Sequence, residues 1–340
     1  MSLDSLIKEY NKTFKSEIVH MGESMYEYER IPFTSPILNR MTYGGIPKGK
    51  LIEFYGDEGG GKTTTALDVV ANYQHMDDAK TVLYVDAENK LDKVWATLLG
   101  VDVDNMLIIT PESQGAETLF EMTLKFMKTG ELGLIVFDSI GALSSDKELE
   151  DDTEIGDKQF GGVALPLTKF SKQAEMYCNK YGCTLIGINQ ERDIINSPYG
   201  GKRTTGGKAW KYHTILRMSF RRGDFFDNNY AKLNNTAESP CGHKVMVDII
   251  KNQTSRNDRR TGYYTLRYDI GVDYLHDVIE LCTAKYGIID KSGAWYSILD
   301  EGGNEIVKLQ GAGNVYKYLE EHTDVLASVE SMLEKKLKES

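Results

Sequence analysis

Apolar residues in the middle of the chain alternate between short continuous runs and segments with a helical spacing. The runs are rich in valine, isoleucine and leucine, which is typical of strands buried on both faces of a parallel sheet. The segments between them have the period of helices with one apolar face. Strands are predicted at 49–56, 81–88, 106–110, 132–139 and 183–190, and helices at 63–74, 92–100, 116–129 and 163–181. This alternation predicts an α/β fold with a mainly parallel sheet.

The two ends of the chain have different patterns. The first residues predict a short amphipathic helix, with an apolar face formed by Leu3, Leu6, Ile7, Tyr10 and Phe14. After residue 214, three segments alternate apolar and polar residues, as antiparallel or mixed edge strands do: 215–222, 244–252 and 262–270. From about Val272 the pattern changes to short helices around a small sheet. We therefore predict an N-terminal segment at 1–30, a core at 31–270 and a small α/β C-terminal domain at 271–340.

Length and composition set further limits. The 340 residues are enough for one large domain and a smaller one. No stretch approaches the roughly 18 apolar residues of a membrane-spanning helix, and the N-terminus lacks the apolar region of a signal peptide. The four cysteines have no metal-binding spacing, so they are expected to be reduced thiols. We expect a cytoplasmic protein without a membrane partner.

The net charge of −11 argues against general affinity for nucleic acid, but charge is unevenly distributed. The stretch 200–222 contains basic residues and no acidic ones, and it follows a glycine-rich loop. The basic residues of this stretch are Lys202, Arg203, Lys208, Lys211, Arg217, Arg221 and Arg222. Either they form an ordinary solvated face or they contact phosphates, and their position favours the second interpretation.

GDEGGGKT at 56–63 matches the phosphate-binding pattern G-x-x-x-x-G-K-[ST], between a predicted strand and a predicted helix. Its glycines let successive amide groups point at phosphate oxygens, and the helix N-terminus favours an anion. Lys62 is predicted to reach the β and γ phosphates of ATP, and the Thr63 hydroxyl to bind Mg²⁺. The residues assigned to nucleotide binding are Gly56, Asp57, Glu58, Gly59, Gly60, Gly61, Lys62, Thr63 and Thr64.

Acidic residues end two of the predicted strands. Asp138 closes LIVFD at 134–138, where its carboxylate is predicted to orient waters on Mg²⁺. Glu88 follows the strand in YVDAEN at 84–89, and it is the favoured group for activating the attacking water. Asp86 is the competing candidate, and both residues could instead cap the next turn.

Two long glycine-containing loops are predicted at 154–162 and 191–207. Loops of this length inside a compact domain are usually functional, although a tolerated surface insertion is the alternative.

These motifs, in this order, resemble the RecA-type DNA recombinases and their phage-encoded relatives. The likeness extends from about Ile18 to Gly313. It rests on GDEGGGKTT (56–64), YVDAEN (84–89), LGVDVDNML (99–107), VFDSIGAL (136–143), EIGDKQFG (154–161), INQ (188–190), TTGGKAWKY (204–212) and GAWYS (293–297). The resemblance implies a RecA-like P-loop ATPase core between an N-terminal oligomerisation helix and a small C-terminal domain.

The resemblance also implies roles for single residues in catalysis. Glu88 matches the catalytic glutamate, and Gln190 matches a residue that senses the γ-phosphate of ATP. Asp92 and Trp95 match positions that hold the adenine. Lys251 matches one of two lysines that reach the ATP of the neighbouring subunit, whereas Gln253 stands in place of the second.

Further matched positions concern DNA and the filament. The two long loops match the DNA-binding loops, and residues 1–30 match a segment that docks onto the next subunit. The implied DNA-binding residues are Phe160, Lys172, Arg192, Tyr199, Lys202, Arg203, Gly206 and Gly207. The implied subunit-interface residues are Lys211, Tyr212 and Arg217.

The implied function is a DNA-dependent ATPase that forms a helical filament on single-stranded DNA and exchanges strands with homologous duplex DNA. Single-strand-binding and loader proteins are further candidate partners. Two alternatives are a ring helicase with the same core and a regulatory relative that binds DNA without exchanging strands. Gln253, and a C-terminus without the long acidic tail of many bacterial members, favour a phage-encoded protein that acts in the bacterial cytoplasm.

Overall fold

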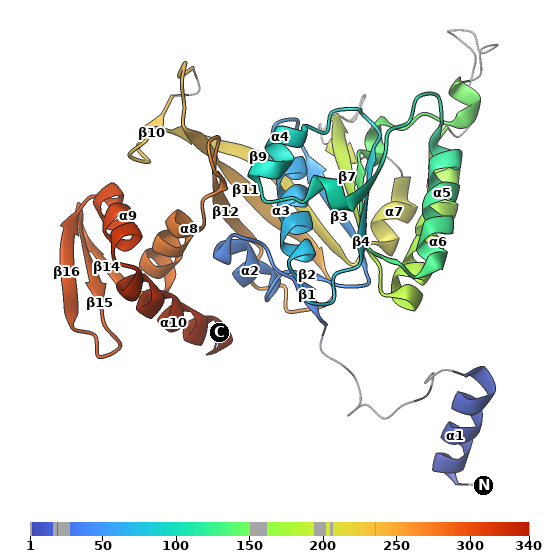
Figure 1. Ribbon diagram of the computed structural model, residues 1–340, viewed down its shortest axis with the longest axis horizontal. Helices are drawn as coiled ribbons and strands as arrows, with labels where there is room; N and C mark the ends of the chain where they lie inside the picture. Colours follow the sequence, from blue (N-terminus) through green and yellow to red (C-terminus); the bar gives the residue numbers. More distant parts are fainter. Residues whose placement is uncertain are drawn as a thin grey trace.

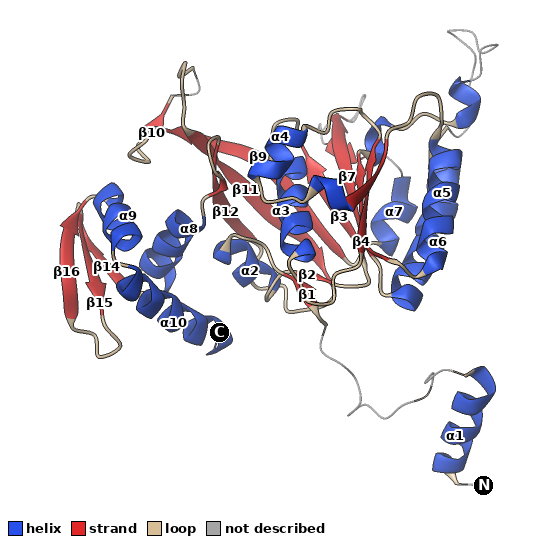
Figure 2. Cartoon of the chain, viewed as in Figure 1, coloured by secondary structure: helices blue, strands red, loops and turns tan. Residues whose placement is uncertain are grey.

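A broad mixed sheet runs through the centre of the protein, with helices on both faces (Figure 1, Figure 2). The computed structural model describes residues 2–15, 19, 28–149, 162–193, 202–204, 207–234 and 236–339. Within these ranges, no helix has both the length and the apolar composition needed to cross a bilayer.

The central strands of the sheet are parallel. In spatial order they are β9 (Leu216–Phe226), β3 (Leu51–Gly56), β7 (Thr184–Asp193), β6 (Leu132–Asp138), β4 (Thr81–Asp86) and β5 (Met106–Ile109). Antiparallel strands extend the sheet beyond β9: β11 (Gly242–Asn252), β12 (Thr261–Arg267) and β13 (Gly271–Val272), while β10 (Lys232–Leu233) pairs with β9. The predicted α/β class, with a mainly parallel sheet and antiparallel edges, is confirmed.

Each face of the sheet carries its own apolar core. One face is covered by α2 (Pro36–Thr42), α3 (Lys62–Gln74) and α4 (Lys93–Leu98), the other by α5 (Ala116–Thr129), α6 (Ala164–Tyr181) and α7 (Gly207–His213). Phe54 and Phe220 pack in the first core, and Phe120 stacks on Phe170 in the second, with ring centres 4.3 Å apart. Burying one such ring contributes roughly 1.5–3 kcal/mol, so the two cores hold the strand ends in fixed positions.

The C-terminal part packs around a third core. It consists of α8 (Tyr274–Leu281), a short π-helix (Cys282–Tyr286), β14 (Ile289–Ser292), β15 (Trp295–Leu299), β16 (Glu305–Gln310), α9 (Ala312–Glu321) and α10 (Thr323–Glu339). A hydrogen-bonded junction joins it to the central sheet. There the carboxylate of Asp277 in α8 accepts from Ser35 before α2 (2.5 Å) and from the amide of Thr265 in β12 (2.9 Å).

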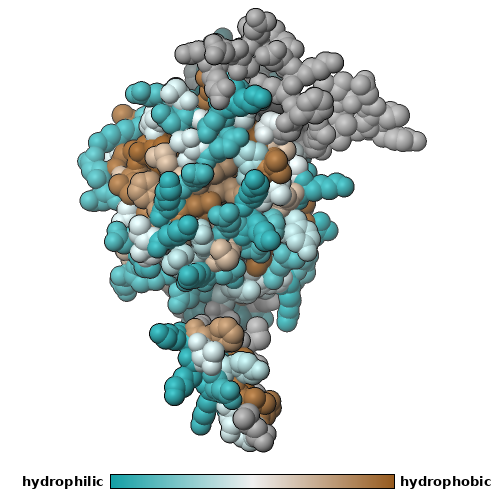
Figure 3. All heavy atoms as spheres, turned by 90° about the vertical axis from the view of Figure 1, so that its right-hand side faces the viewer, coloured by the Kyte–Doolittle hydropathy of each residue, from teal (hydrophilic) through white to brown (hydrophobic). Residues whose placement is uncertain are grey.

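The N-terminal helix α1 (Leu3–Phe14) is not part of a hydrophobic core within the described residues. It begins at the N-cap Ser2 and contains no buried residue. Leu3, Tyr10 and Phe14 are exposed, and brown, apolar atoms are visible on this helix at the bottom of Figure 3. The chain then enters the core through a small antiparallel pair, β1 (Arg30–Ile31) and β2 (Ile46–Pro47).

The stretch predicted as a loop at 191–207 is in part a hairpin, so that prediction was wrong at its two ends. β7 continues to Asp193 and pairs with β8 (Lys202–Thr204) in antiparallel register. Pairing satisfies backbone groups that a loop would leave to water, which explains why the strand extends past its apolar run. Residues 194–201 and 205–206 lie outside the described residues, as do 150–161, which contain most of the other predicted loop.

Candidate active site

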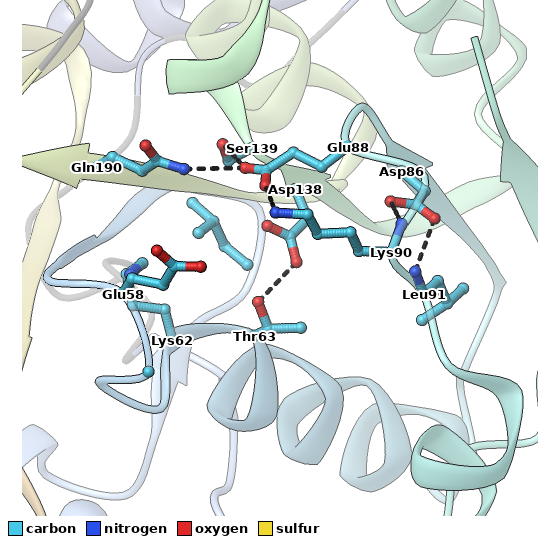
Figure 4. A pocket seen from close by; sticks show the side chains of 12 residues that line it. Glu58, Lys62, Thr63, Asp86, Glu88, Lys90, Leu91, Asp138, Ser139 and Gln190 are labelled. Carbon is cyan, nitrogen blue, oxygen red and sulfur yellow. Dashed lines mark hydrogen bonds and ion pairs between the residues drawn. The ribbon is translucent and has the colours of Figure 1, made fainter. Parts of the chain in front are cut away.

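A cavity of about 210 Å³ lies where the parallel strands end (Figure 4). In an open α/β sheet, ligands bind at the carboxyl ends of the strands. The cavity is lined by Glu58, Gly59, Lys62, Thr63, Asp86, Glu88, Lys90, Leu91, Asp138, Ser139, Ile188 and Gln190. The fold therefore brings together five residues predicted to act on ATP or its metal: Lys62, Thr63, Glu88, Asp138 and Gln190.

The glycines of the loop between β3 and α3 shape one wall of this cavity. Gly56, Gly59 and Gly61 have φ values of 141°, 68° and 93°, a region that side chains disfavour. A Cβ atom on Gly56 would also lie 2.0 Å from the carbonyl oxygen of Phe220. The loop thus requires glycine, and it places the free amide groups of the α3 N-terminus where an anion would bind.

Lys62 folds back over this loop. Its Nζ donates to the carbonyl oxygens of Gly56 (3.0 Å) and Asp57 (2.7 Å). Burial lowers the pKa of Lys62, while Asp138 and Asp57 act in the opposite direction. A buried ammonium beside free helix amides forms a concentrated positive site, suited to the phosphates of a nucleotide.

Thr63 and Asp138 form an oxygen pair opposite the loop. Thr63 Oγ1 donates to Asp138 Oδ2 at 2.7 Å, and the hydroxyl of Tyr84 donates to the same oxygen at 2.8 Å. Burial raises the pKa of Asp138 despite these two hydrogen bonds. Hard oxygen ligands of this kind fit Mg²⁺. Among the described residues, no group of three or more His, Cys, Asp or Glu could hold a metal ion.

Three side chains from three elements hold the carboxylate of Glu88. Ser139, after β6, donates to Oε1 at 2.7 Å, and Gln190 Nε2, in β7, donates to the same oxygen at 3.0 Å. Lys90 Nζ donates to Oε2 at 2.7 Å. Burial would raise the pKa of Glu88, but the hydrogen bonds from Lys90, Ser139 and Gln190 lower it below the usual value. The side chain is therefore an ionised carboxylate with a fixed orientation.

Asp86, the competing candidate, has a different environment. Its two carboxylate oxygens accept from the backbone amides of Lys90 (3.0 Å) and Leu91 (2.8 Å). These bonds hold the turn after β4, as an Asx-type cap does. Asp86 is thus engaged with its own backbone, whereas Glu88 points into the cavity (Figure 4).

The residues predicted to hold adenine do not line the cavity. Asp92 is the N-cap of α4, where Oδ1 accepts from the amides of Val94 (2.8 Å) and Trp95 (3.2 Å). Trp95 is half-buried against the core of that face. Thr64 is half-buried in the first turn of α3. The adenine contacts of Asp92 and Trp95 stay predictions.

Lys251, predicted to reach a neighbouring subunit, is bound within its own chain. Its Nζ donates to the carbonyl oxygens of Lys211 (3.2 Å), Tyr212 (2.9 Å) and Thr214 (2.5 Å). The last carbonyls of a helix lack intrahelical partners, so this lysine caps the C-terminus of α7. Its pKa is lowered by burial and by the neighbouring Arg217.

The predicted interface residues differ in exposure. The side chain of Tyr212 is 80% exposed on α7. Arg217 instead forms an ion pair with the fully buried Glu53, and its guanidinium lies over the Tyr55 ring. Arg217 therefore has an internal structural role in this chain.

The structure places only some of the predicted DNA-binding residues. Lys172 is exposed on α6, and Gly207 begins α7. Arg192 in β7 pairs in register with Arg203 in β8, beside Lys202. Phe160, Tyr199 and Gly206 lie outside the described residues.

Tyr84, Lys90 and Ser139 were not predicted as site residues. Ser139 directly follows Asp138, whereas Tyr84 and Lys90 lie four residues before and two residues after Glu88. Their partners come from other strands or depend on the shape of a turn, so no local pattern indicated these contacts.

Comparison with known proteins identifies the family to which the chain belongs. The family model of the RecA N-terminal domain matches residues 1–273, and that of the RecA C-terminal domain matches 276–338. Protein RecA of Teredinibacter turnerae is 32% identical over 343 residues, covering 99% of this chain and 93% of that protein. Protein RecA of Fusobacterium nucleatum is 35% identical over 319 residues, covering 93% and 79%. The chain therefore belongs to the RecA family of DNA recombinases, which are DNA-dependent ATPases.

Proposed function

We propose that the cavity at the strand ends is the ATP site and that its state controls how the chain holds single-stranded DNA. One observation carries the proposal: Glu88, at the site of hydrolysis, is hydrogen-bonded to Gln190 in β7. β7 continues through residues 191–193 into the segment that resembles the second DNA-binding loop. A single strand thus connects the two sites.

In this mechanism the β3–α3 loop and Lys62 bind the β and γ phosphates of ATP. The amides of the α3 N-terminus and the buried ammonium stabilise the charge that develops during transfer. Thr63 and Asp138 would hold Mg²⁺, which neutralises phosphate charge when bound. Glu88, ionised and held by its donors, orients the attacking water and accepts its proton. The products are ADP and phosphate.

Gln190 links this chemistry to DNA. Its amide has one donor group directed at Glu88, and a γ-phosphate oxygen would compete for that group. A different orientation of Gln190 would be transmitted along β7 to its partner β8, and these two strands flank residues 194–201. ATP would favour the arrangement that grips DNA, and hydrolysis would release it.

The DNA would lie along the loops at 154–162 and 191–207. We propose that Phe160 and Tyr199 contact bases, and that Lys172, Arg192, Lys202 and Arg203 contact phosphates. Gly206 and Gly207 would permit close approach of the backbone. Phosphate contacts of this kind make binding salt-dependent and insensitive to sequence.

Assembly would use the segment 1–30 and the surface near α7. The exposed apolar face of α1 is suited to a head-to-tail contact with the next subunit, which produces a filament when the rotation does not close. Tyr212 and Lys211 would lie at this interface. Lys251 would have to leave the α7 carbonyls to reach ATP on the neighbour.

We further infer a chain with a core at 31–270 and a small domain at 271–340, acting with homologous duplex DNA and with single-strand-binding and loader proteins. Gln253, which stands in place of the second of the two lysines, supports a phage-encoded origin, with action in the cytoplasm of an infected bacterium.

The variant Glu88→Gln tests the catalytic assignment. The amide keeps the size of the side chain but loses its charge and one acceptor oxygen, and it cannot take a proton from water. It should bind ATP and single-stranded DNA as the wild type does, with turnover lowered by roughly a hundredfold or more. Phosphate release and equilibrium binding measure the two properties separately. Wild-type turnover in this variant would remove Glu88 from its role.

A further inference from the structure

The turn after β4 presents a second cation to the cavity. Asp86 binds the amides of Lys90 and Leu91, and Asn89 adopts a left-handed conformation with φ of 53°. This geometry turns the side chains of Glu88 and Lys90 toward each other. Their charged atoms are 2.7 Å apart (Figure 4).

The charges around the cavity make this contact significant. Four carboxylates line it, from Glu58, Asp86, Glu88 and Asp138, against two ammonium groups, from Lys62 and Lys90. Lys62 is held by two carbonyl oxygens of the phosphate loop. Nearby anions raise the pKa of a carboxylate, and the cation of Lys90 acts on Glu88 in the opposite direction.

The three donors to Glu88 divide between its oxygens. The neutral groups of Ser139 and Gln190 both contact Oε1, and the charged Lys90 contacts Oε2. The Glu88 side chain is 18% exposed and that of Lys90 is 68% exposed. Lys90 therefore approaches from the solvent side and holds Oε2 of Glu88, the oxygen that Ser139 and Gln190 do not contact.

We propose that Lys90 is a positioning residue for ATP hydrolysis, which holds the carboxylate of Glu88 oriented toward the attacking water. This inference rests on the proposed role of Glu88. Lys90 acts on the carboxylate and not on the phosphates, so its loss lowers kcat while the KM for ATP is kept.

Lys90→Met tests this, because it keeps the length of the side chain and removes the charge. With single-stranded DNA present, kcat should fall about two- to fivefold, as expected for an exposed charge pair. The KM for ATP should change less than about twofold. Lys90→Arg should restore kcat. The matched control is Lys93→Met, which removes an exposed ion pair with Asp104 on the same segment but outside the cavity.

A double-mutant cycle shows whether Lys90→Met lowers turnover through Glu88 or independently of it. In the Glu88→Gln background, Lys90→Met should have no further effect on the residual turnover. Wild-type kcat in Lys90→Met, a rise in KM alone, or an equal loss in both backgrounds would overturn the inference. If Glu88→Gln itself has wild-type turnover, the proposed catalytic role of Glu88 is wrong. If Glu88→Gln is inactive while Lys90→Met resembles the wild type, only the inference about Lys90 fails.

Discussion

Oxygen atoms from two distant segments meet at the head of α3. Thr63 opens the helix and Asp138 ends β6, yet their side chains are 2.7 Å apart. The raised pKa of Asp138, which results mainly from burial, shows that its charge is poorly solvated in this position. A divalent cation between these oxygens and the phosphates would relieve that cost, which is the physical basis for assigning Mg²⁺ here.

Replacing Thr63 tests the metal assignment. Thr63→Val removes the hydroxyl and keeps the shape of the side chain, so Mg²⁺ should no longer tighten ATP binding. We expect an ATP affinity at least tenfold weaker than wild type with Mg²⁺ present, and similar to wild type when the metal is chelated. Titration calorimetry with and without Mg²⁺ measures both values. Thr63→Ser, which keeps a hydroxyl, should behave as wild type, and a normal Mg²⁺ response in Thr63→Val would contradict the assignment.

The glycines, Lys62 and Thr63 could be expected to lie together because they are contiguous in the sequence. Glu88 was predicted from a strand end and Gln190 from the family resemblance, and both lie where the carboxyl ends of the parallel strands meet at one edge of the sheet. The donors Tyr84, Lys90 and Ser139 could not be predicted, since their contacts depend on strand order and turn geometry. The contact of Lys251 with the ATP of a neighbouring subunit stays a prediction. Within its own chain the ammonium caps α7, because unpaired carbonyls at a helix end attract a nearby donor.

At the scale of elements, α8 is fixed to the core by a buried carboxylate. Asp277 contacts Ser35 and the amide of Thr265, so it joins α2, β12 and α8. Burial raises the pKa of Asp277 to about 8, and the nearby Asp273 acts in the same direction. The folded protein therefore binds this proton more tightly than the unfolded chain does.

The stability of this junction should depend on pH. Because the pKa of Asp277 is higher in the folded protein, its protonated form contributes its full stabilisation below the pKa of the unfolded chain, near 3.8. This contribution to the free energy of unfolding is lost as the pH rises to about 8. Asp277→Asn removes this titration, because the amide can donate to Ser35 and accept from Thr265. The Tm of the variant should exceed that of wild type by a few degrees at pH 8, and the difference should shrink steadily as the pH falls toward about 4. The exposed Asp290→Asn is the control, and parallel pH profiles for Asp277→Asn and wild type would contradict this account.

Elements with a strong apolar period were predicted to within a residue or two, as α5 at 116–129 and α6 show. The extension of β7 and the short β8 were not predicted. Their residues are polar and charged, and only pairing between 191–193 and 202–204 makes them strands. Long-range pairing of this kind leaves no local pattern in the sequence.

For the whole molecule, α1 is notable because it contains no buried residue. Its apolar side chains are exposed, which is costly unless another surface covers them. A contact with the next subunit in the filament would do so.

A charge on the apolar face of α1 should therefore block assembly. Tyr10→Glu should prevent filament formation on single-stranded DNA, with ATP binding by the monomer unchanged, because the nucleotide site lies in the core. Electron microscopy and sedimentation measure assembly. Lys12→Glu, which changes the polar face of the same helix, is the control. Filaments of wild-type length with Tyr10→Glu would exclude this face as the contact.

We propose that nucleotide bound at the strand ends controls the affinity for DNA through Gln190 and β7. The most direct measurement is the affinity of the protein for a labelled single-stranded oligonucleotide with ATP, with ADP and without nucleotide, at one salt concentration. The account predicts the tightest binding with ATP, and binding at least tenfold weaker in the other two states. Equal affinity in all three states would contradict it.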